Sequence, residues 1–455
     1  MPVVTRLPRV LGPVQAFAVV VGGVIGASIF LVPSIVASRV PSISSVILVW
    51  VLGALVSLSG ALTFSELAAM LPEAGGGYVY IRTALGPFAA FLFGWTDALL
   101  IRAGAAAAIS FTFAIYFAEL VPAPAAMPLP VWQGLLGVAV IAILTATNLR
   151  GTRIGANVQV TGTVIKMIAV GAAAVLPVLL WRGANSLYSA PTAPHPEVLA
   201  ALTPILWTYT GWDQLTHLAE EVKDPGRNLP RILAGGILTV ATLYLGAVLG
   251  IHYVLPYGVV AKSNAVGADL FRALLGPAGA TIISVMIMIS AVITANGALL
   301  AAPRPVFAMA RDGYGPRWIS RVHPRFQTPA NAILLTGLWS ALLIAISVPL
   351  MQAKQKPLFE VLLSYVMFGY LGFQCLVVVS AFVLRKKMPL ANRPYRIPLY
   401  PWLPAMSFLA TAFLMVTTVV SNPTECAVGV AIVATGIPVW WFYRSGAATL
   451  TSARK

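Results

Sequence analysis

The sequence predicts an all-α polytopic membrane protein, from its composition, its apolar blocks and its loop charges. Of its 455 residues, 59% are hydrophobic and 9% are charged, and the mean hydropathy is +0.89. Soluble chains carry about 25% charged residues, so this composition excludes a water-exposed globular surface. Many apolar blocks reach about 18 residues, the length that a helix needs to cross a bilayer. Membrane strands are shorter and alternate in polarity, so the spans are expected to be helices.

Hydropathy and helix-breaking residues predict twelve spans in order. The segment 1–15 is short and no A-x-A cleavage site follows it, so the first span is expected to be retained. The predicted spans are 14–37, 43–70, 84–118, 131–148, 157–181, 198–218, 231–255, 276–302, 329–349, 357–384, 399–420 and 424–443.

The basic residues predict the orientation, because Lys and Arg concentrate in cytoplasmic loops. With the N-terminus inside, 21 of the 29 basic residues are cytoplasmic and six are outside, and Arg102 and Lys166 lie within spans. Both termini are therefore expected in the cytoplasm, and we expect a cell (inner) membrane location. The net charge of +16 is explained by these loops and does not indicate nucleic-acid binding.

Several function classes lack their sequence signals. The four histidines and the cysteines Cys375 and Cys426 have no metal-ligand spacing, so no metal site is expected. The sequence contains no P-loop, which would indicate ATP-driven pumping. It also contains no nucleophile elbow or other catalytic constellation, which would indicate an enzyme. No cofactor is expected.

Two predicted spans contain matching interruptions. Span 1 carries glycines and a serine within Val21–Pro33, and span 6 carries a glycine between small polar residues within Trp207–Asp213. Such residues weaken a helix, and unwound backbone is tolerated in a membrane where it lines a cavity. Gly22-x-x-x-Gly26 alone could equally mark close helix packing. Paired interruptions five spans apart favour a transporter built from two inverted halves. Exposed N–H groups and carbonyls at such breaks suit the carboxylate and ammonium of an amino acid.

Motifs along residues 10–440 resemble those of a known family. They are Ile25 to Phe30, Glu66-Leu67, Pro72 to Tyr78, Leu100 to Arg102, Asn148 to Gly151, Gln159 with Lys166, Tyr209 to Asp213, Glu220 to Pro225, Pro303-Arg304 and Ala310 to Gly313. Because these motifs occur together and in this order, the chain resembles the amino acid–polyamine–organocation (APC) superfamily. Within it, the chain resembles the bacterial members of the L-type amino acid transporter (LAT) branch.

The resemblance implies a LeuT-type 5+5 inverted repeat with two additional C-terminal helices. The first repeat would cover 14–181 and the second 198–384, the extra helices 399–443, and the whole would form one domain, 1–443, with a short cytoplasmic tail, 444–455. It also implies amino acid exchange by alternating access. The substrate-binding residues it implies are Val24, Ile25, Gly26, Ala27, Ser28, Trp207, Thr208, Tyr209, Thr210, Gly211 and Trp212.

Individual roles within this set follow from the motif match. Val24, Ala27 and Ser28 would face the substrate carboxylate, the Thr208 carbonyl would face the amino group, and Trp207 would close over the substrate. The chain has Gly26-Ala27-Ser28 where the family has Gly-Ser-Gly, and Thr210 replaces a glycine. Both changes narrow the pocket and favour alanine, serine or threonine. Trp212 could be a gate or could pack against span 1.

Lys166 lies about ten residues into span 5, where an ionisable residue is expected to be functional. By resemblance it stands where sodium-coupled relatives bind an ion, so its ammonium would replace Na⁺. A proton-carrying lysine and a snorkelling lysine are the alternatives.

Other charges allow two interpretations each. Asp97 and Arg102 are five residues apart, about 140° around an α-helix, so they are not expected to pair with each other. Asp213 is expected to cap a helix rather than contact substrate. Glu66, Glu73, Arg82, Glu220 and their neighbours could form a cytoplasmic latch, but solvated loop charge is the simpler interpretation. The Arg102-Ala103 step replaces a family Arg-Pro and leaves the shape of span 3 open.

The sequence thus predicts sodium-independent exchange of small neutral L-amino acids. A proton-coupled symporter of the same fold and a transport-inactive amino acid sensor are the alternatives. The loop 119–130 lacks the cysteine by which animal LAT light chains join a heavy subunit, so no disulfide-linked heavy subunit is expected. The oligomeric state is not predicted.

Overall fold

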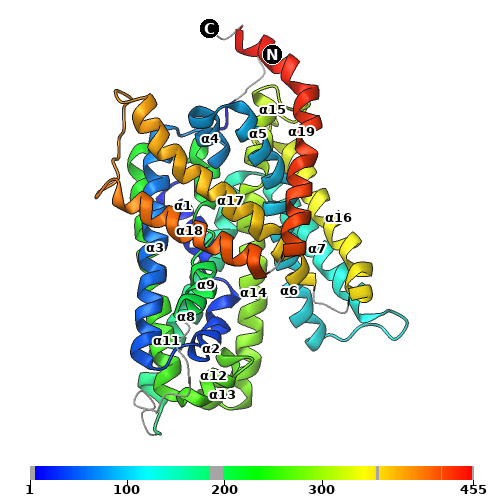
Figure 1. Ribbon diagram of the computed structural model, residues 1–455. Coiled ribbons are helices and arrows are strands. Elements are labelled where there is room, and N and C mark those ends of the chain that lie inside the picture. Colours follow the sequence, from blue (N-terminus) through cyan, green and yellow to red (C-terminus); the bar gives the residue numbers. More distant parts are fainter. Residues whose placement is uncertain (1–5, 184–197, 355–357, 422, 453–455) are drawn as a thin grey trace.

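The computed structural model describes residues 6–183, 198–354, 358–421 and 423–452 as a helical bundle (Figure 1). Within these ranges 10 helices are long and apolar enough to cross a membrane. Two shorter apolar helices, Pro13–Val24 and Val198–Thr208, lie in the first and sixth predicted spans. The all-helical polytopic class is confirmed, whereas the count of twelve spans and the inverted repeat stay predictions.

The helix bounds follow the predicted spans closely. Before residue 183 the spans contain α1 (Pro13–Val24), η1 (Ala27–Phe30), α2 (Val32–Ala37), α3 (Ile43–Met70), α5 (Pro87–Thr96), η2 (Asp97–Ile101), α6 (Arg102–Leu120), α7 (Leu129–Leu149) and α8 (Thr152–Leu180). After residue 197 they contain α9 (Val198–Thr208), α10 (Gln214–His217), α11 (Pro225–Val254), α14 (Pro277–Ala301), α16 (Ala330–Lys354), α17 (Leu358–Lys387), α18 (Trp402–Ser421) and α19 (Pro423–Ser452).

Capping residues explain several of these boundaries. The Ser42 side chain accepts a hydrogen bond from the Ser45 N–H at 3.2 Å, which satisfies a donor in the first turn of α3. Pro13, Pro225 and Pro277 begin α1, α11 and α14, where a missing N–H costs nothing.

Short helices outside the spans were not predicted. They are α4 (Gly77–Leu85), η4 (Ala219–Glu221), α12 (Tyr257–Lys262), α13 (Val266–Leu275) and α15 (Pro303–Arg311). In addition, α19 continues to Ser452, so most of the predicted tail is helical, and residues 453–455 lie outside the described ranges. His195, Lys356, Arg454 and Lys455 also lie outside them.

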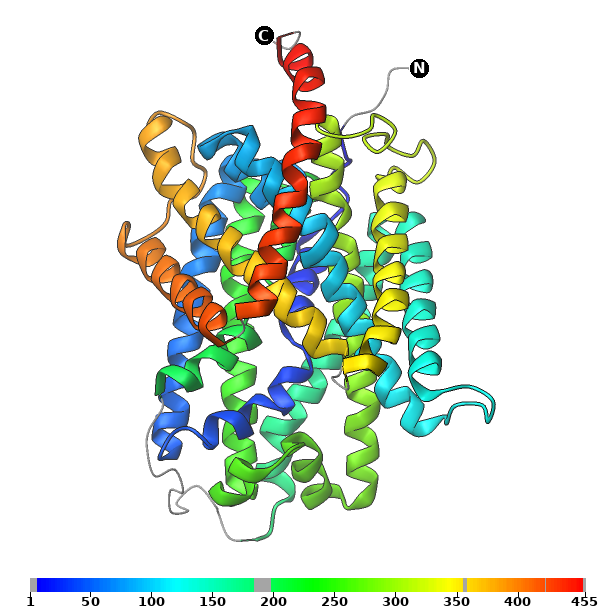
Figure 2. The same cartoon turned by 45° about the vertical axis from the view of Figure 1, so that its right-hand side comes forward.

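The interrupted helix α1 lies at the centre of the bundle, packed against α8, α11 and α14 (Figure 2). The second interrupted helix, α9, packs on α3, and α10 contacts α1. Helices α18 and α19 bury little of their surface and lie at the periphery. The core therefore places both breaks among long helices and away from the surface.

The bundle has two distinct ends. Helices α4 and α15 lie at one end, together with the C-terminal end of α19, and α12 and α13 lie at the other (Figures 1 and 2). We call them the α15 end and the α13 end.

Candidate functional site

The first break begins where α1 ends at Val24. Ile25 and Gly26 are extended, and the chain resumes helical geometry at Ala27. An interrupted helix leaves carbonyl groups without helical partners. Here the Tyr244 hydroxyl donates to the Val24 carbonyl at 3.0 Å, and Lys166 binds the carbonyls of Gly22 and Ile25. The predicted interruption is confirmed, and other helices stabilise it.

The second break follows α9. Gly211 has a φ of +107°, a conformation that favours glycine, and α10 starts three residues later. The Thr210 hydroxyl donates to the Trp207 carbonyl at 2.7 Å, and Ser57 of α3 donates to the Tyr209 carbonyl at 3.3 Å. Among the described residues no donor reaches the Thr208 carbonyl. Thr208 is itself buried, and a contact of its carbonyl with a substrate amino group stays a prediction.

The two breaks meet at a pair of glycines. A Cβ on Gly23 would lie 2.8 Å from the Gly211 carbonyl oxygen, and a Cβ on Gly211 would clash with the carbonyl of Gly23. Only glycine permits this approach of two backbones. The structure therefore brings together the two segments that the sequence singled out.

Gly26 differs from the other glycines of the break. A Cβ on Gly26 would meet nothing nearer than 3.9 Å, whereas one on Gly22 would overlap Thr163. Ala27 and Ser28 are partly exposed, as are Trp207 and Thr210 across the break. The backbone at Gly26 therefore borders open space, where a ligand can approach it closely.

A cavity of about 60 Å³ adjoins the second break. Tyr209, Thr210 and Trp212 line it together with residues of α3, α17 and α18, but no residue of the first break does. The Trp212 ring packs edge-on against Phe64 of α3, with centroids 4.9 Å apart. Of the two interpretations of Trp212, this contact matches packing, although against α3 and not against span 1.

Lys166 on α8 makes contacts that use all three of its ammonium hydrogens. Its Nζ lies 2.8 Å from the Gly22 carbonyl oxygen, 2.7 Å from that of Ile25 and 2.6 Å from Thr294 Oγ1 of α14. The residue is 2% exposed, so the snorkelling alternative is wrong. The Lys166 side chain thereby joins the first break to α8 and α14.

Asp97 and Arg102 contact each other, contrary to the prediction. Arg102 Nε lies 3.4 Å from Asp97 Oδ1. The reason is that η2 is a π-helical turn, in which the Arg102 N–H bonds to the Asp97 carbonyl. In a π turn, residues five apart lie on the same face, whereas the prediction assumed α-helical geometry. This also answers the open question of the shape of span 3.

Asp213 does not act as the predicted helix cap. It precedes α10, but its side chain makes no capping hydrogen bond. Its carboxylate instead pairs with Arg102, and the Tyr370 hydroxyl of α17 lies 3.4 Å from it. His217 Nε2 is 3.3 Å from Arg102 Nη2. A buried cluster of Asp97, Arg102, Asp213, His217 and Tyr370 thus connects span 3 to the second break.

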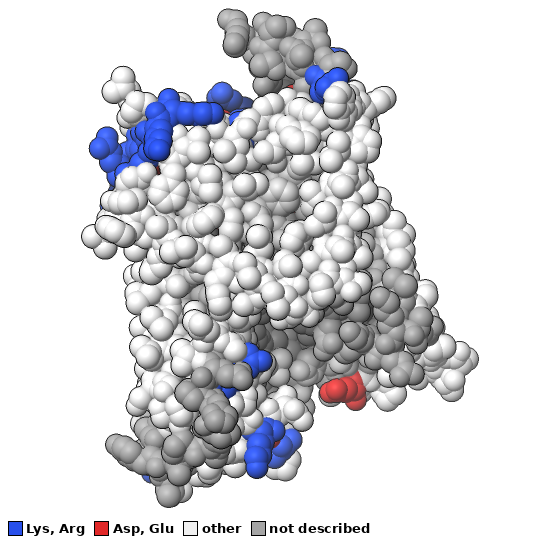
Figure 3. All heavy atoms as spheres, in the orientation of Figure 1, with Lys and Arg blue, Asp and Glu red and all other residues white. Residues whose placement is uncertain are grey.

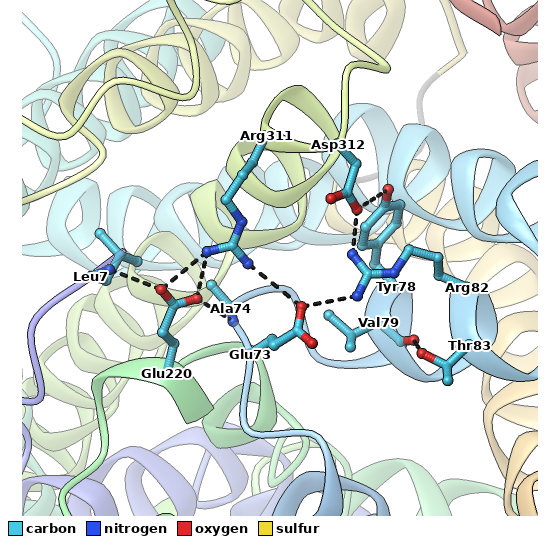
Figure 4. Close-up of polar contacts among 10 residues, drawn as sticks. All are labelled: Leu7, Glu73, Ala74, Tyr78, Val79, Arg82, Thr83, Glu220, Arg311 and Asp312. Carbon is cyan, nitrogen blue, oxygen red and sulfur yellow. Dashed lines mark hydrogen bonds and ion pairs between the residues drawn. The ribbon is translucent and has the colours of Figure 1, made fainter. Parts of the chain in front are cut away.

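An ion-pair network closes the α15 end (Figure 4). We call the side chains of Glu73, Arg82, Glu220, Arg311 and Asp312 the end network. Arg311 Nη1 lies 2.8 Å from Glu220 Oε2. Arg82 pairs with Glu73 at 2.9 Å and also pairs with Asp312, so it connects the two carboxylates. Burial lowers the pKa of the Arg82 guanidinium, but the nearby Asp312 and Glu73 carboxylates outweigh burial and raise this pKa above its ordinary value. The guanidinium therefore stays charged.

The end network joins segments that are distant in the sequence. Glu220 also accepts the backbone N–H groups of Leu7 and Ala74, both at 2.9 Å. It follows α10, and Arg311 ends α15. The simpler interpretation, solvated loop charge, is therefore wrong for these residues, and the latch interpretation describes their contacts.

Two further carboxylates at this end are buried and paired. Glu221 contacts Arg304 at 2.8 Å, and both side chains are fully buried. Glu66 binds Arg385 at 2.6 Å and Arg393 at 3.3 Å. Because these acidic residues all have basic partners, several elements are fixed together at the α15 end.

The described residues contain no group of three or more His, Cys, Asp or Glu side chains able to hold a metal ion. Cys375 and Cys426 are buried in α17 and α19. Neither lies in the loop between α6 and α7, where a link to a heavy subunit was considered.

Comparison with known proteins identifies the family. The amino acid permease family model matches residues 11–443, so the chain belongs to this family, which lies within the APC superfamily. It is an amino acid permease, and the family consists of transporters rather than enzymes.

Similar proteins include bacterial and mammalian members. The serine/threonine exchanger SteT of Bacillus subtilis (strain 168) is 28% identical over 96% of this chain and 97% of its own length. The large neutral amino acids transporter small subunit 2 of Oryctolagus cuniculus is 31% identical over 96% of this chain and 80% of its own. The asc-type amino acid transporter 1 of Mus musculus is 28% identical over 96% of this chain and 82% of its own.

Proposed function

We propose that this permease exchanges small neutral L-amino acids across the cell membrane without sodium, by alternating access. The observation that carries the proposal is the contact between two interrupted helices at Gly23 and Gly211, with open backbone at Gly26 and no donor at the Thr208 carbonyl among the described residues. N–H groups after Gly26 would bind the substrate carboxylate, and the Thr208 carbonyl would bind its ammonium. Twelve spans in two inverted halves would frame this site.

Independence from sodium rests on Lys166. Its ammonium occupies a position among two carbonyls of the first break and a hydroxyl of α14. Carbonyl and hydroxyl oxygens are also the ligands that alkali cations use, so a bound sodium ion would compete with the ammonium for the same oxygens. A protonated Lys166 at this point would hold the break without a co-transported ion.

The side chains at the site favour small substrates. Ser28 and Thr210 carry side chains where the family has glycine, and Trp207 belongs to the second break. The relative SteT is named a serine/threonine exchanger, and the Oryctolagus cuniculus relative is named a large neutral amino acids transporter. We therefore propose alanine, serine and threonine as substrates.

Alternating access would require the α15 end to open. The basic-residue distribution assigns this end to the cytoplasm, with both termini on the same side. The end network and the Glu221–Arg304 pair then close the cytoplasmic route, because they tie α4, η4 and α15 together. No heavy subunit is needed for these contacts.

Flux measurements in liposomes test the proposal. The purified protein is reconstituted without sodium, and uptake of labelled alanine and serine is measured with and without unlabelled amino acid inside. We expect uptake only into the loaded vesicles, unchanged by sodium. Uptake into empty vesicles that grows with an inward proton gradient would replace exchange with proton-coupled symport. Amino acid binding without flux in either condition would favour a sensor.

A further inference from the structure

A groove of about 700 Å³ lies at the start of α11, and no residue of either break lines it. One wall is the start of α11, from Asp224 to Ala234, and the other is Pro394 and Tyr395 in the turn between α17 and α18. Leu62 of α3 forms its apolar floor. Nothing in the transport mechanism proposed above uses this groove.

The open rim of the groove is positively charged. Arg227 and Arg231 both line it, are exposed, and lie one helical turn apart on α11. Neither forms an ion pair with a described residue. Asp224 also lines the groove, which leaves one positive charge in excess. Figure 3 shows a cluster of Lys and Arg side chains at the α15 end, above a surface with almost no charge.

The depth of the groove matches the boundary of a membrane. Leu62 lies eight residues before the end of α3, which is about 12 Å of helix. Ala234 adds apolar surface one turn beyond Arg231 along α11, and Pro230 lies between the two arginines in the sequence. With the α15 end on the cytoplasmic side, as proposed above, the arginines would lie near the lipid headgroups, and Leu62 and Ala234 would lie nearer the hydrocarbon.

The groove is held in shape by contacts that do not involve its arginines. Glu66 fixes the turn that forms one wall, because its carboxylate binds Arg385, Arg393 and, at 2.8 Å, the Ile397 N–H. A Cβ on Gly226 would lie 3.0 Å from Pro394, so the two walls pack closely at their base. A preformed groove loses little conformational entropy when a ligand binds.

We infer that this groove binds an anionic phospholipid from the cytoplasmic leaflet. The headgroup phosphate lies between Arg227 and Arg231, and an acyl chain lies along Pro230, Ala234 and Leu62. A guanidinium pairs with phosphate through parallel hydrogen bonds, which suits these two arginines better than lysines would. The apolar floor distinguishes a lipid from free phosphate, which would gain nothing from it.

Native mass spectrometry of the full-length protein tests this site. The protein is taken from vesicles of phosphatidylcholine with and without phosphatidylglycerol, and bound lipids are counted. Wild type is expected to retain phosphatidylglycerol. Arg227→Gln combined with Arg231→Gln should lower retention roughly 25-fold, because each basic side chain near an anionic surface contributes about a fivefold gain in binding. Equal retention by this variant and wild type would overturn the inference.

A matched variant separates the groove from surface charge. Arg150 follows α7 and Arg153 lies in the first turn of α8, and both are exposed and outside the groove. Arg150→Gln with Arg153→Gln removes the same charge and should leave retention unchanged. An equal loss in both double variants would show a diffuse surface effect and overturn the site.

A third variant tests the acyl chain. Ala234→Leu fills the floor and keeps both arginines, so it should lower phosphatidylglycerol retention while thermal stability in detergent stays at the wild-type value. Retention unchanged by Ala234→Leu, together with thermal stabilisation of wild type by inorganic phosphate alone, would identify an anion site and overturn the lipid assignment.

Discussion

At the scale of single residues, Lys166 carries the sharpest expectation. Replacing it with methionine keeps most of its volume but leaves the Gly22 and Ile25 carbonyls without their donor. Each unsatisfied buried acceptor costs about 1–3 kcal/mol, so we expect a lower melting temperature and loss of exchange. Thermal unfolding in detergent and alanine–serine exchange in liposomes measure the two effects.

The control for this prediction is Lys262→Met. Lys262 is exposed at the end of α12, so its substitution should leave both stability and exchange unchanged. If Lys166→Met exchanges amino acids at the wild-type rate, the ammonium is not required for sodium-independent transport and that part of the proposal fails.

The second residue-scale prediction concerns Arg102. Arg102→Met leaves two buried carboxylates, Asp97 and Asp213, without their cation. Loss of one partner from a buried pair typically costs about 3–5 kcal/mol. Arg272→Met breaks the exposed Arg272–Asp269 pair, whose loss costs about 0–1 kcal/mol. In denaturation experiments, Arg102→Met should therefore be clearly less stable than Arg272→Met. Equal stabilities would mean that the carboxylates bind protons readily enough to tolerate the loss.

Residue-scale sequence reasoning succeeded for Lys166 and failed for Arg102 for a definite reason. A charged residue ten positions into an apolar span has to find oxygen partners nearby, so burial among polar atoms was predictable. The Asp97–Arg102 contact depends on one π turn, and no residue pattern in 97–102 signals that geometry. The partner of Asp213 depends on the same turn, because the turn directs Arg102 toward it.

At the scale of elements, hydropathy predicted the long helices well. The predicted span 43–70 coincides with α3, and most other spans differ from their helices by a few residues at each end. The short helices α12 and α13 were missed because they do not cross the membrane and are too short for the hydropathy pattern. The contacts that close the α15 end were also missed in part, since they join loops far apart in sequence.

The two glycines of the breaks are expected to respond differently to substitution. Gly211→Ala puts a Cβ against the Gly23 carbonyl at a positive φ, so it should lower the melting temperature and abolish transport. Gly26→Ala meets no atom nearer than 3.9 Å, and its extended backbone accepts alanine. It should therefore unfold at the wild-type temperature but bind substrate more weakly.

The half-saturation concentration for serine exchange, measured beside thermal unfolding, separates the two cases. An unstable Gly26→Ala protein would show that the space beside Gly26 is not open in the membrane. A stable one with wild-type half-saturation would remove Gly26 from the substrate site.

At the scale of the whole molecule, the proposed alternating access gives the end network a role in deciding which side of the protein is open. Glu220 and Arg311 connect η4, which follows the second break, to the end of α15. If the proposed opening of the cytoplasmic side separates α15 from η4, the network is lost in the open conformation, and its contacts stabilise the closed one. A ligand or a mutation shifts such an equilibrium only through contacts that differ between the two states.

Arg311→Gln should therefore favour the conformation open at the cytoplasmic side. It removes the contacts to Glu220 and Glu73, each worth about 0–1 kcal/mol at a partly exposed site and more where burial limits screening. A Gly26→Cys substitution supplies a thiol at the first break. We expect this thiol to react several-fold faster with a polar thiol reagent added on the cytoplasmic side. The background carries Cys375→Ala and Cys426→Ala, so that position 26 has the only thiol.

Arg272→Gln, at the α13 end, is the control and should leave that rate unchanged, since Arg272 has no part in the end network. The same reagent added from the outside should react more slowly in Arg311→Gln than in the background protein. The reason is that a larger fraction of molecules open to the cytoplasm leaves a smaller fraction open to the outside. A faster reaction from both sides would mean that the substitution loosens the bundle instead of shifting it. In that case the end network would contribute stability, and the opening of the cytoplasmic route would depend on other contacts, of which the buried Glu221–Arg304 pair is the next to test.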